Sequence, residues 1–211
     1  MADRASRNSA EVFYRIAEPQ AGYFTSAQAQ TAGICHQLLS HHAKRGHIIR
    51  VRRGIYRLAL FPTGLNEDLF VAWLEAGPHA VISHDSALAL HGLADASPAE
   101  IHITIPRTAS RRHPKLGLHT GRLTAEEVTR QAGLPVTTIS RTLADIVAAG
   151  LDDELAVQVM ARAIQKGMVS PEGLALVNTR CCKRVEGLFQ AALARCDGAV
   201  VAPSSNDHAR T

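Results

Sequence analysis

The chain has 211 residues, a formal net charge of +4 and a hydrophobic content of 46%, which is enough for one large or two small domains with packed cores. It contains no run of about 18 apolar residues, and its N-terminal segment lacks the apolar region of a secretory signal. Its four cysteines show no C-x-x-C spacing, so we expect neither a disulfide framework nor a zinc site. The sequence therefore predicts a cytoplasmic protein that does not associate with membranes.

The basic charge is concentrated in the first part of the chain. Residues 1–61 contain nine Lys and Arg residues against three acidic ones, whereas residues 62–100 contain six acidic residues and no Lys or Arg. A basic region next to an acidic one makes the charge distribution asymmetric, which is typical of nucleic-acid-binding proteins. Charge that serves only solubility would be spread evenly over the surface.

Three helices are expected before residue 47. The first covers about residues 8–18. Thr25, followed three positions later by Gln28, is a capping-box pattern that begins the second helix. The third carries its apolar residues at a spacing close to one face of a 3.6-residue period. It ends at Gly46, where a left-handed residue is favoured.

A basic hairpin follows the third helix. Two strands are expected over residues 47–51 and 55–60, with a turn at Arg52-Arg53-Gly54. Three helices followed by such a hairpin predict a winged helix-turn-helix, with duplex DNA as its partner.

The outward polar face of the third helix and the hairpin form the predicted DNA-binding surface. Its arginines on the hairpin would contact phosphates irrespective of sequence, and the polar residues of the helix would read base edges in the major groove. Basic residues on a hairpin are often only a solvated face, but the adjacent helix pair favours DNA contact. The predicted DNA-binding residues are His36, Gln37, Ser40, His41, Lys44, Arg45, Arg50, Arg52 and Arg53.

A second domain is expected after Pro62-Thr63-Gly64. Its strands are predicted over residues 80–82, 101–105 and 116–122, and its helices over 66–76, 83–91, 138–149, 152–166, from Ser170-Pro171-Glu172 onward, and 185–196. The fold class is therefore α+β. We expect a winged helix-turn-helix over residues 1–61, a mixed α+β domain ending in helices over 62–196, and a disordered tail over 197–211.

The eleven histidines raise the possibility of a metal site. His84 and His91 are seven residues apart, on one face of a predicted helix, and His36, His41 and His42 form another group. Zinc ligands usually come as two closely spaced pairs, and no second pair is visible. Structural or DNA-facing histidines are therefore favoured, and we predict no metal and no cofactor.

No catalytic residue is predicted. The consecutive residues His84-Asp85-Ser86 cannot turn toward one another as a triad, and Arg141 and Asp145 have the spacing of an ion pair within a helix. The basic loop 107–115 is equally compatible with nucleic-acid contact and with simple exposure. The sequence thus predicts a protein that is not an enzyme.

The first part of the chain resembles the winged helix of AbiEi-family antitoxins. The resemblance is most specific in the hairpin, where the family's signature falls on Gly46, Ile48, Ile49, Arg50, Val51, Arg53, Gly54, Ile55 and Tyr56. The stretches VISHDSALALHGL, IHITIP and GLPVTTISRTLADI are similar to the family's second domain, so the resemblance covers about residues 9–150. One departure is Cys35, where Ser or Thr is usual, so the third helix is expected to be less firmly capped.

This resemblance implies an antitoxin of a bacterial type IV toxin–antitoxin system. Such a protein binds inverted repeats in its own promoter through the winged helix and represses the operon. Its second domain is associated with counteracting a cognate nucleotidyltransferase-like toxin, with which it need not form a stable complex.

Two other functions remain open on the residues alone. The chain is also compatible with an ordinary winged-helix transcriptional regulator whose second domain senses a ligand or dimerises. It is further compatible with a second domain that acts as an enzyme on nucleic acid or on the toxin. Convergent carboxylates or a deep polar pocket after residue 62 would favour the enzyme.

Overall fold

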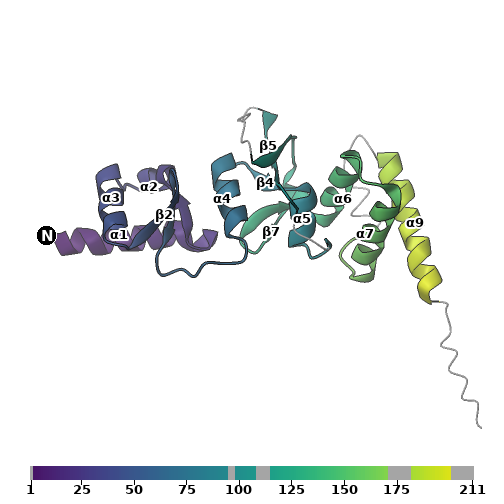
Figure 1. Ribbon diagram of the computed structural model, residues 1–211, viewed down its shortest axis with the longest axis horizontal. Helices are drawn as coiled ribbons and strands as arrows, with labels where there is room; N and C mark the ends of the chain where they lie inside the picture. Colours follow the sequence, from purple (N-terminus) through teal and green to yellow (C-terminus); the bar gives the residue numbers. More distant parts are fainter. Residues whose placement is uncertain (1, 95–97, 108–114, 171–181, 201–211) are drawn as a thin grey trace, which may run out of the picture.

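The computed structural model describes residues 2–94, 98–107, 115–170 and 182–200, and the molecule is elongated (Figure 1). The N-terminal helices lie at one end, a mixed sheet occupies the middle, and the last helices lie at the other end. The helix predicted from Ser170-Pro171-Glu172 lies almost wholly outside the described residues, as do most of the basic loop 107–115 and residues 201–211.

The N-terminal module has the predicted three helices and hairpin. Its elements are α1 (Ala2–Ala17), η1 (Glu18–Gln20), α2 (Ser26–Thr31), α3 (His36–Lys44), β2 (Ile48–Arg52) and β3 (Ile55–Leu58). The capping box of α2 is confirmed, because the Gln28 backbone N–H donates to Thr25 Oγ1 at 3.1 Å and the Thr25 N–H donates to Gln28 Oε1 at 2.8 Å. Helix α1 begins several residues before the predicted position 8.

A short strand, β1 (Tyr23–Thr25), completes this module and was not predicted. It pairs antiparallel with β3, so the strand order is β1-β3-β2. At only three residues, β1 is too short to show an alternating pattern. Gly22 leads into it with a φ of +88°, and a Cβ there would lie 2.5 Å from the Phe61 side chain.

Strands β1 and β3 pack against apolar residues on both faces of the three-stranded sheet. Along β1, Phe24 packs with the helices of the N-terminal module, whereas Tyr23 packs against the next part of the chain. Along β3, Tyr56 packs with the helices of the N-terminal module and Ile55 packs on the opposite side. The second face is covered by α4 (Glu67–Ala76). The Tyr23 ring stacks on that of Phe70, with centroids 5.6 Å apart and planes inclined by 9°.

The middle module is built on a second sheet with the strand order β6-β5-β4-β8-β7 in the described residues. Its elements are β4 (Val81–Ile82), α5 (His84–Leu90), β5 (Ile101–Ile105), β6 (Leu116–Thr120), η3 (Ala125–Glu127), β7 (Val128–Gln131) and β8 (Leu134–Thr137). The predicted strands β4, β5 and β6 are confirmed. The hairpin β7–β8 was missed, because its two-residue turn, Ala132-Gly133, needs positive φ at both positions and Ala is a poor signal for such a turn.

Helices α6 (Ile139–Ala148), α7 (Asp153–Gln165) and α9 (Cys182–Val200) form the C-terminal end. They enclose an apolar core that includes Leu143, Met160 and Phe189 and that Leu88 of α5 joins. Helix α9 continues to Val200, which corrects the predicted start of the disordered tail at residue 197. The residues that follow Asp197 up to Val200 include no proline that would end the helix.

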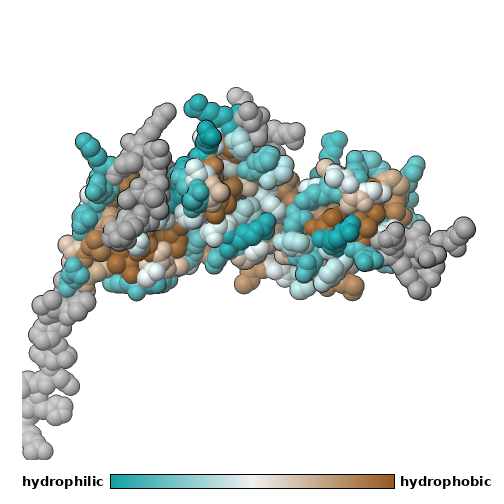
Figure 2. Space-filling view, turned by 180° about the vertical axis from the view of Figure 1, so that it is seen from behind, coloured by the Kyte–Doolittle hydropathy of each residue, from teal (hydrophilic) through white to brown (hydrophobic). Residues whose placement is uncertain are grey.

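The surface is not uniformly polar. On the face seen in Figure 2, apolar residues gather over the N-terminal part and over the C-terminal helices. At the N-terminal end, Leu60 is 97% exposed and Tyr14 is 55% exposed. In the described part of the chain, no helix combines the length and the apolar character that crossing a bilayer requires.

The stacked contact between β1 and α4 should carry much of the stability at the junction of the first two modules. We expect Phe70→Ala to lower the free energy of unfolding by about 3–5 kcal/mol, because Phe70 is almost fully buried and the substitution opens a cavity. Urea denaturation measures this loss. Leu65→Ala is the matched control, since Leu65 is fully exposed and its truncation should change stability little. A loss below about 1 kcal/mol for Phe70→Ala would contradict the shared core.

Candidate nucleic-acid interface

Helix α3 is the candidate recognition helix. It starts after Cys35, whose backbone is extended and whose side chain makes no capping hydrogen bond to the helix N–H groups. The thiol instead lies 3.9 Å from Gln37 Oε1. The weaker cap expected from Cys35 is therefore confirmed. Gly46 follows the helix with a φ of +73°, as the C-terminal signal predicts.

The predicted base-reading and phosphate-binding residues of α3 share one exposed face. Ile34 and Leu39 point into the module core, which turns the opposite side of the helix outward. His36 also connects the two helices of the pair, with its Nε2 atom 2.9 Å from Gln30 Nε2. The exposed residues on this face are His36, Gln37, Ser40, His41, Lys44 and Arg45.

His42 does not belong to that face, although the sequence grouped it with His36 and His41. It is buried, with 1% of its surface exposed. Its ring meets Phe13 edge-on at 5.0 Å, and its Nδ1 atom lies 3.1 Å from Nδ1 of His47. Burial lowers the pKa of His42, so the ring is a neutral core residue that anchors α3 to α1 and to His47, which precedes β2.

The wing arginines point in different directions. Arg50 pairs with Tyr56 across the hairpin and Arg52 pairs with Ile55, with a bulge between them. Paired residues on neighbouring strands project to the same face of a sheet. Arg50 therefore lies on the face that carries the helices, whereas Arg52 lies on the α4 side. Arg53 occupies the exposed turn before Gly54.

Arg52 forms an ion pair with Glu75 of α4. Its Nη1 atom lies 3.2 and 3.1 Å from the two carboxylate oxygens, and the two side chains are 48% and 24% exposed. A pair this exposed contributes at most about 1 kcal/mol, but it offsets the charge of Arg52. In the described residues, neither Arg50 nor Arg53 has an acidic partner. The sequence analysis predicted the same DNA-binding role for all three arginines, because Glu75 is distant from Arg52 in the chain and their contact could not be foreseen.

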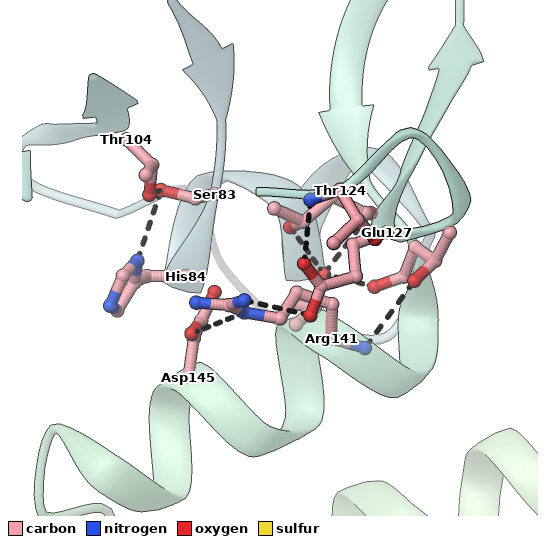
Figure 3. A network of polar contacts seen from close by, with 10 residues as sticks. Ser83, His84, Thr104, Thr124, Glu127, Arg141 and Asp145 are labelled. Atoms are coloured by element: carbon pink, nitrogen blue, oxygen red, sulfur yellow. Dashed lines mark hydrogen bonds and ion pairs between the residues drawn. The ribbon is translucent and has the colours of Figure 1, made fainter. Parts of the chain in front are cut away.

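A buried charged triad lies where α6 meets the middle module. The Arg141 guanidinium lies between two carboxylates, 2.8 Å from Glu127 Oε1 and 2.8 Å from Asp145 Oδ1 (Figure 3). The predicted pair within α6 is thus confirmed, with Glu127 as an unpredicted third member. Glu127 also accepts a hydrogen bond from the Thr124 backbone N–H at 2.9 Å. These carboxylates converge on an arginine and leave no acid–base pair facing each other.

Three histidines stack beside this triad. The rings of His84 and His119 are 3.5 Å apart and nearly parallel, and His102 Nδ1 lies 2.9 Å from His119 Nε2. His84 Nδ1 is 3.0 Å from Ser83 Oγ, which accepts from the Thr104 hydroxyl (Figure 3). Among the described residues, no group of three or more His, Cys, Asp or Glu side chains has an arrangement that could hold a metal ion.

His84 and His91 lie at the two ends of α5 and have different partners. His84 begins α5 with a φ of +51°, and its Nδ1 lies 3.0 Å from Ser83 Oγ, whereas His91 Nε2 lies 2.8 Å from the Thr137 carbonyl oxygen. Burial lowers the pKa of His84 to about 3, helped by His119 and His102. Burial also lowers the pKa of His119, so these two rings are neutral near pH 7.

Comparison with known proteins finds a family model that matches the N-terminal module. Residues 14–59, from α1 to the end of the wing, match the profile of the family described as "Transcriptional regulator, AbiEi antitoxin". The resemblance predicted from the sequence is confirmed over these residues, and it supports a DNA-binding transcriptional regulator.

One similar solved structure is that of the RV2827C protein from Mycobacterium tuberculosis. The TM-score is 0.52 at 15% sequence identity, over 95% of this chain and 81% of that chain. At this identity the likeness shows a shared fold. No curated protein matches the chain.

The neutral histidine stack should make stability depend on pH. The unfolded chain takes up a proton on His84 near pH 6.5, whereas the folded chain does so only near pH 3, so stability falls as the pH drops through this window. We expect His84→Asn, in which Asn tolerates the left-handed backbone, to remove up to about 1.4 kcal/mol per pH unit of that slope. Urea unfolding between pH 7 and 4 measures it, with exposed His79→Asn as control. An unchanged slope for His84→Asn would contradict the assignment.

Proposed function

We propose that the chain is the antitoxin of a type IV toxin–antitoxin system and represses its own operon by binding inverted repeats in the promoter. The observation that carries this proposal is the continuous exposed polar face of α3 beside two wing arginines without acidic partners in the described residues. The family match covers that same helix and wing.

In this proposal, α3 enters the major groove and the wing follows the phosphate backbone. Gln37 and Ser40 stand at the centre of the exposed face, where hydrogen bonds to base edges discriminate sequence. Arg50 and Arg53 supply the sequence-independent phosphate contacts. Arg52 contributes less than either, because Glu75 competes with phosphate for its guanidinium.

The remainder of the chain, residues 62–196, is assigned to counteracting a cognate nucleotidyltransferase-like toxin in the cytoplasm. Two observations support a separate task for it. It contains the five-stranded sheet, and among the described residues the core of its C-terminal helices includes no residue of the winged helix. An ordinary regulator with a ligand-sensing domain is the second candidate, favoured by a cleft that Trp73, Arg141 and Asp145 line.

DNA titrations at several salt concentrations test the wing. We expect Arg50→Ala with Arg53→Ala to weaken binding to all sequences and to reduce the slope of log affinity against log salt by about 1.8, because about 0.9 is lost per phosphate contact. Arg52→Ala should change the slope much less, and Glu75→Gln should raise it. Gln37→Ala is the matched control, since it should reduce operator preference by about 1–3 kcal/mol and leave the slope intact. Equal slope losses for Arg52→Ala and Arg53→Ala would contradict this division.

Growth rescue tests whether the two activities separate. In cells that express the toxin from an independent promoter, the Arg50→Ala, Arg53→Ala double variant should restore growth like the native chain while it fails to repress a promoter reporter. The full chain is needed, because a fragment ending at residue 61 would expose Tyr23 and Ile55, which α4 covers. Loss of rescue at native expression levels would show that DNA binding and toxin counteraction are one activity.

A further inference from the structure

The middle module contains a cleft of about 1210 Å³ that the proposed DNA contact does not use. It lies at the edge of the five-stranded sheet where β5 and β6 end and where β4 and β8 begin. Trp73 of α4 lines it, and so do Arg141 and Asp145 of α6. Its volume exceeds that of most sites for small ligands, which span about 300–1,000 Å³.

Arginines surround the mouth of the cleft. Arg107 follows the end of β5 and Arg122 follows the end of β6, and both side chains are exposed. Neither forms an ion pair or a hydrogen bond within the described residues. Arg130 of β7 also lines the cleft and donates to the Gly133 carbonyl at 3.1 Å. The planar fork of a guanidinium matches phosphate oxygens, so this edge favours a ligand with more than one negative charge.

A buried hydrogen-bond acceptor lies inside the same cleft. The Asp145 side chain is 9% exposed, and its Oδ1 atom binds Arg141. Its Oδ2 atom is buried and has no hydrogen-bond partner within the described part of the chain. Leaving such a group unpaired costs about 1–3 kcal/mol, and more when it is charged. A hydroxyl or amino group of a ligand would offset that cost.

We propose that this cleft binds a nucleotide, either free or as the terminal unit of a strand. The phosphates lie on Arg107 and Arg122, and a hydroxyl or amino group of the sugar or base donates to Asp145 Oδ2. An inorganic polyphosphate would satisfy the arginines and leave Asp145 unpaired. The amino group of an amino acid could donate to Asp145 Oδ2, but its single carboxylate would leave the charge of several arginines uncompensated. This inference does not depend on the role proposed for residues 62–196 in counteracting a toxin.

The only tryptophan of the chain, Trp73, reports on this cleft directly. We expect its fluorescence in the full-length protein to change saturably on titration with ATP, with GTP or with a 5′-phosphorylated tetranucleotide RNA. Binding of the mononucleotides alone identifies a free nucleotide, and binding of the RNA alone identifies a strand end. Tripolyphosphate should bind at least tenfold more weakly than the preferred nucleotide. The proposal is overturned if none binds at millimolar concentration, or if tripolyphosphate binds equally well.

Variants separate this cleft from the wing. The Arg107→Ala, Arg122→Ala double variant should weaken nucleotide binding at least tenfold and leave operator binding unchanged. The matched control, Arg50→Ala with Arg53→Ala, should do the reverse. Asp145→Asn should reduce the preference for nucleotide over tripolyphosphate, and circular dichroism verifies that it folds. If the wing variant loses nucleotide binding as much as the cleft variant does, the nucleotide binds at the DNA surface and the proposal fails.

Discussion

The arrangement of the first two modules depends on the alternation of side chains along β1 and β3. Successive residues of a strand point to opposite faces, so Phe24 and Tyr56 enter the helical core while Tyr23 and Ile55 meet α4. A shift of one residue would exchange these two sets and bury neither correctly. The same alternation therefore holds the recognition helix in its module and fixes that module against the middle sheet.

This sheet also determines which basic groups remain available to DNA. The bulge between Arg50 and Arg52 lets residues two apart in the sequence face opposite sides of the sheet. One arginine faces away from α4, and the other meets Glu75. A phosphate that approaches Arg52 must compete with a carboxylate already in place, whereas Arg50 presents an uncompensated charge. Counting positive charges along the hairpin therefore overestimates its electrostatic contribution.

Local signals in the sequence predicted the helices of the winged module and its hairpin. The Thr25–Gln28 capping box and Gly46 each depend on neighbouring residues only, so they can be read without a structure. The missed features depend on distant partners. Strand β1 forms because it pairs with β3, and Glu75 reaches Arg52 only because the fold brings α4 beside the hairpin. His42 was grouped with His36 and His41 from the sequence, and only its packing against Phe13 and His47 shows that it is buried apart from them.

Buried histidine and buried arginine differ in charge in the polar interior beside α6. The rings of His84 and His119 lose their charge on burial, which lowers their pKa, so they stack without repulsion. Arg141 cannot lose its proton in this way, and it is buried with the carboxylates Glu127 and Asp145. Two carboxylates exceed the charge of one guanidinium, and burial raises the pKa of Asp145 against the opposing effect of Arg141. The unpaired acceptor, Asp145 Oδ2, belongs to a residue that lines the cleft. Arg107 and Arg122 line the same cleft and lack partners in the described residues. The cleft therefore offers groups for a ligand that carries both phosphate and a hydrogen-bond donor.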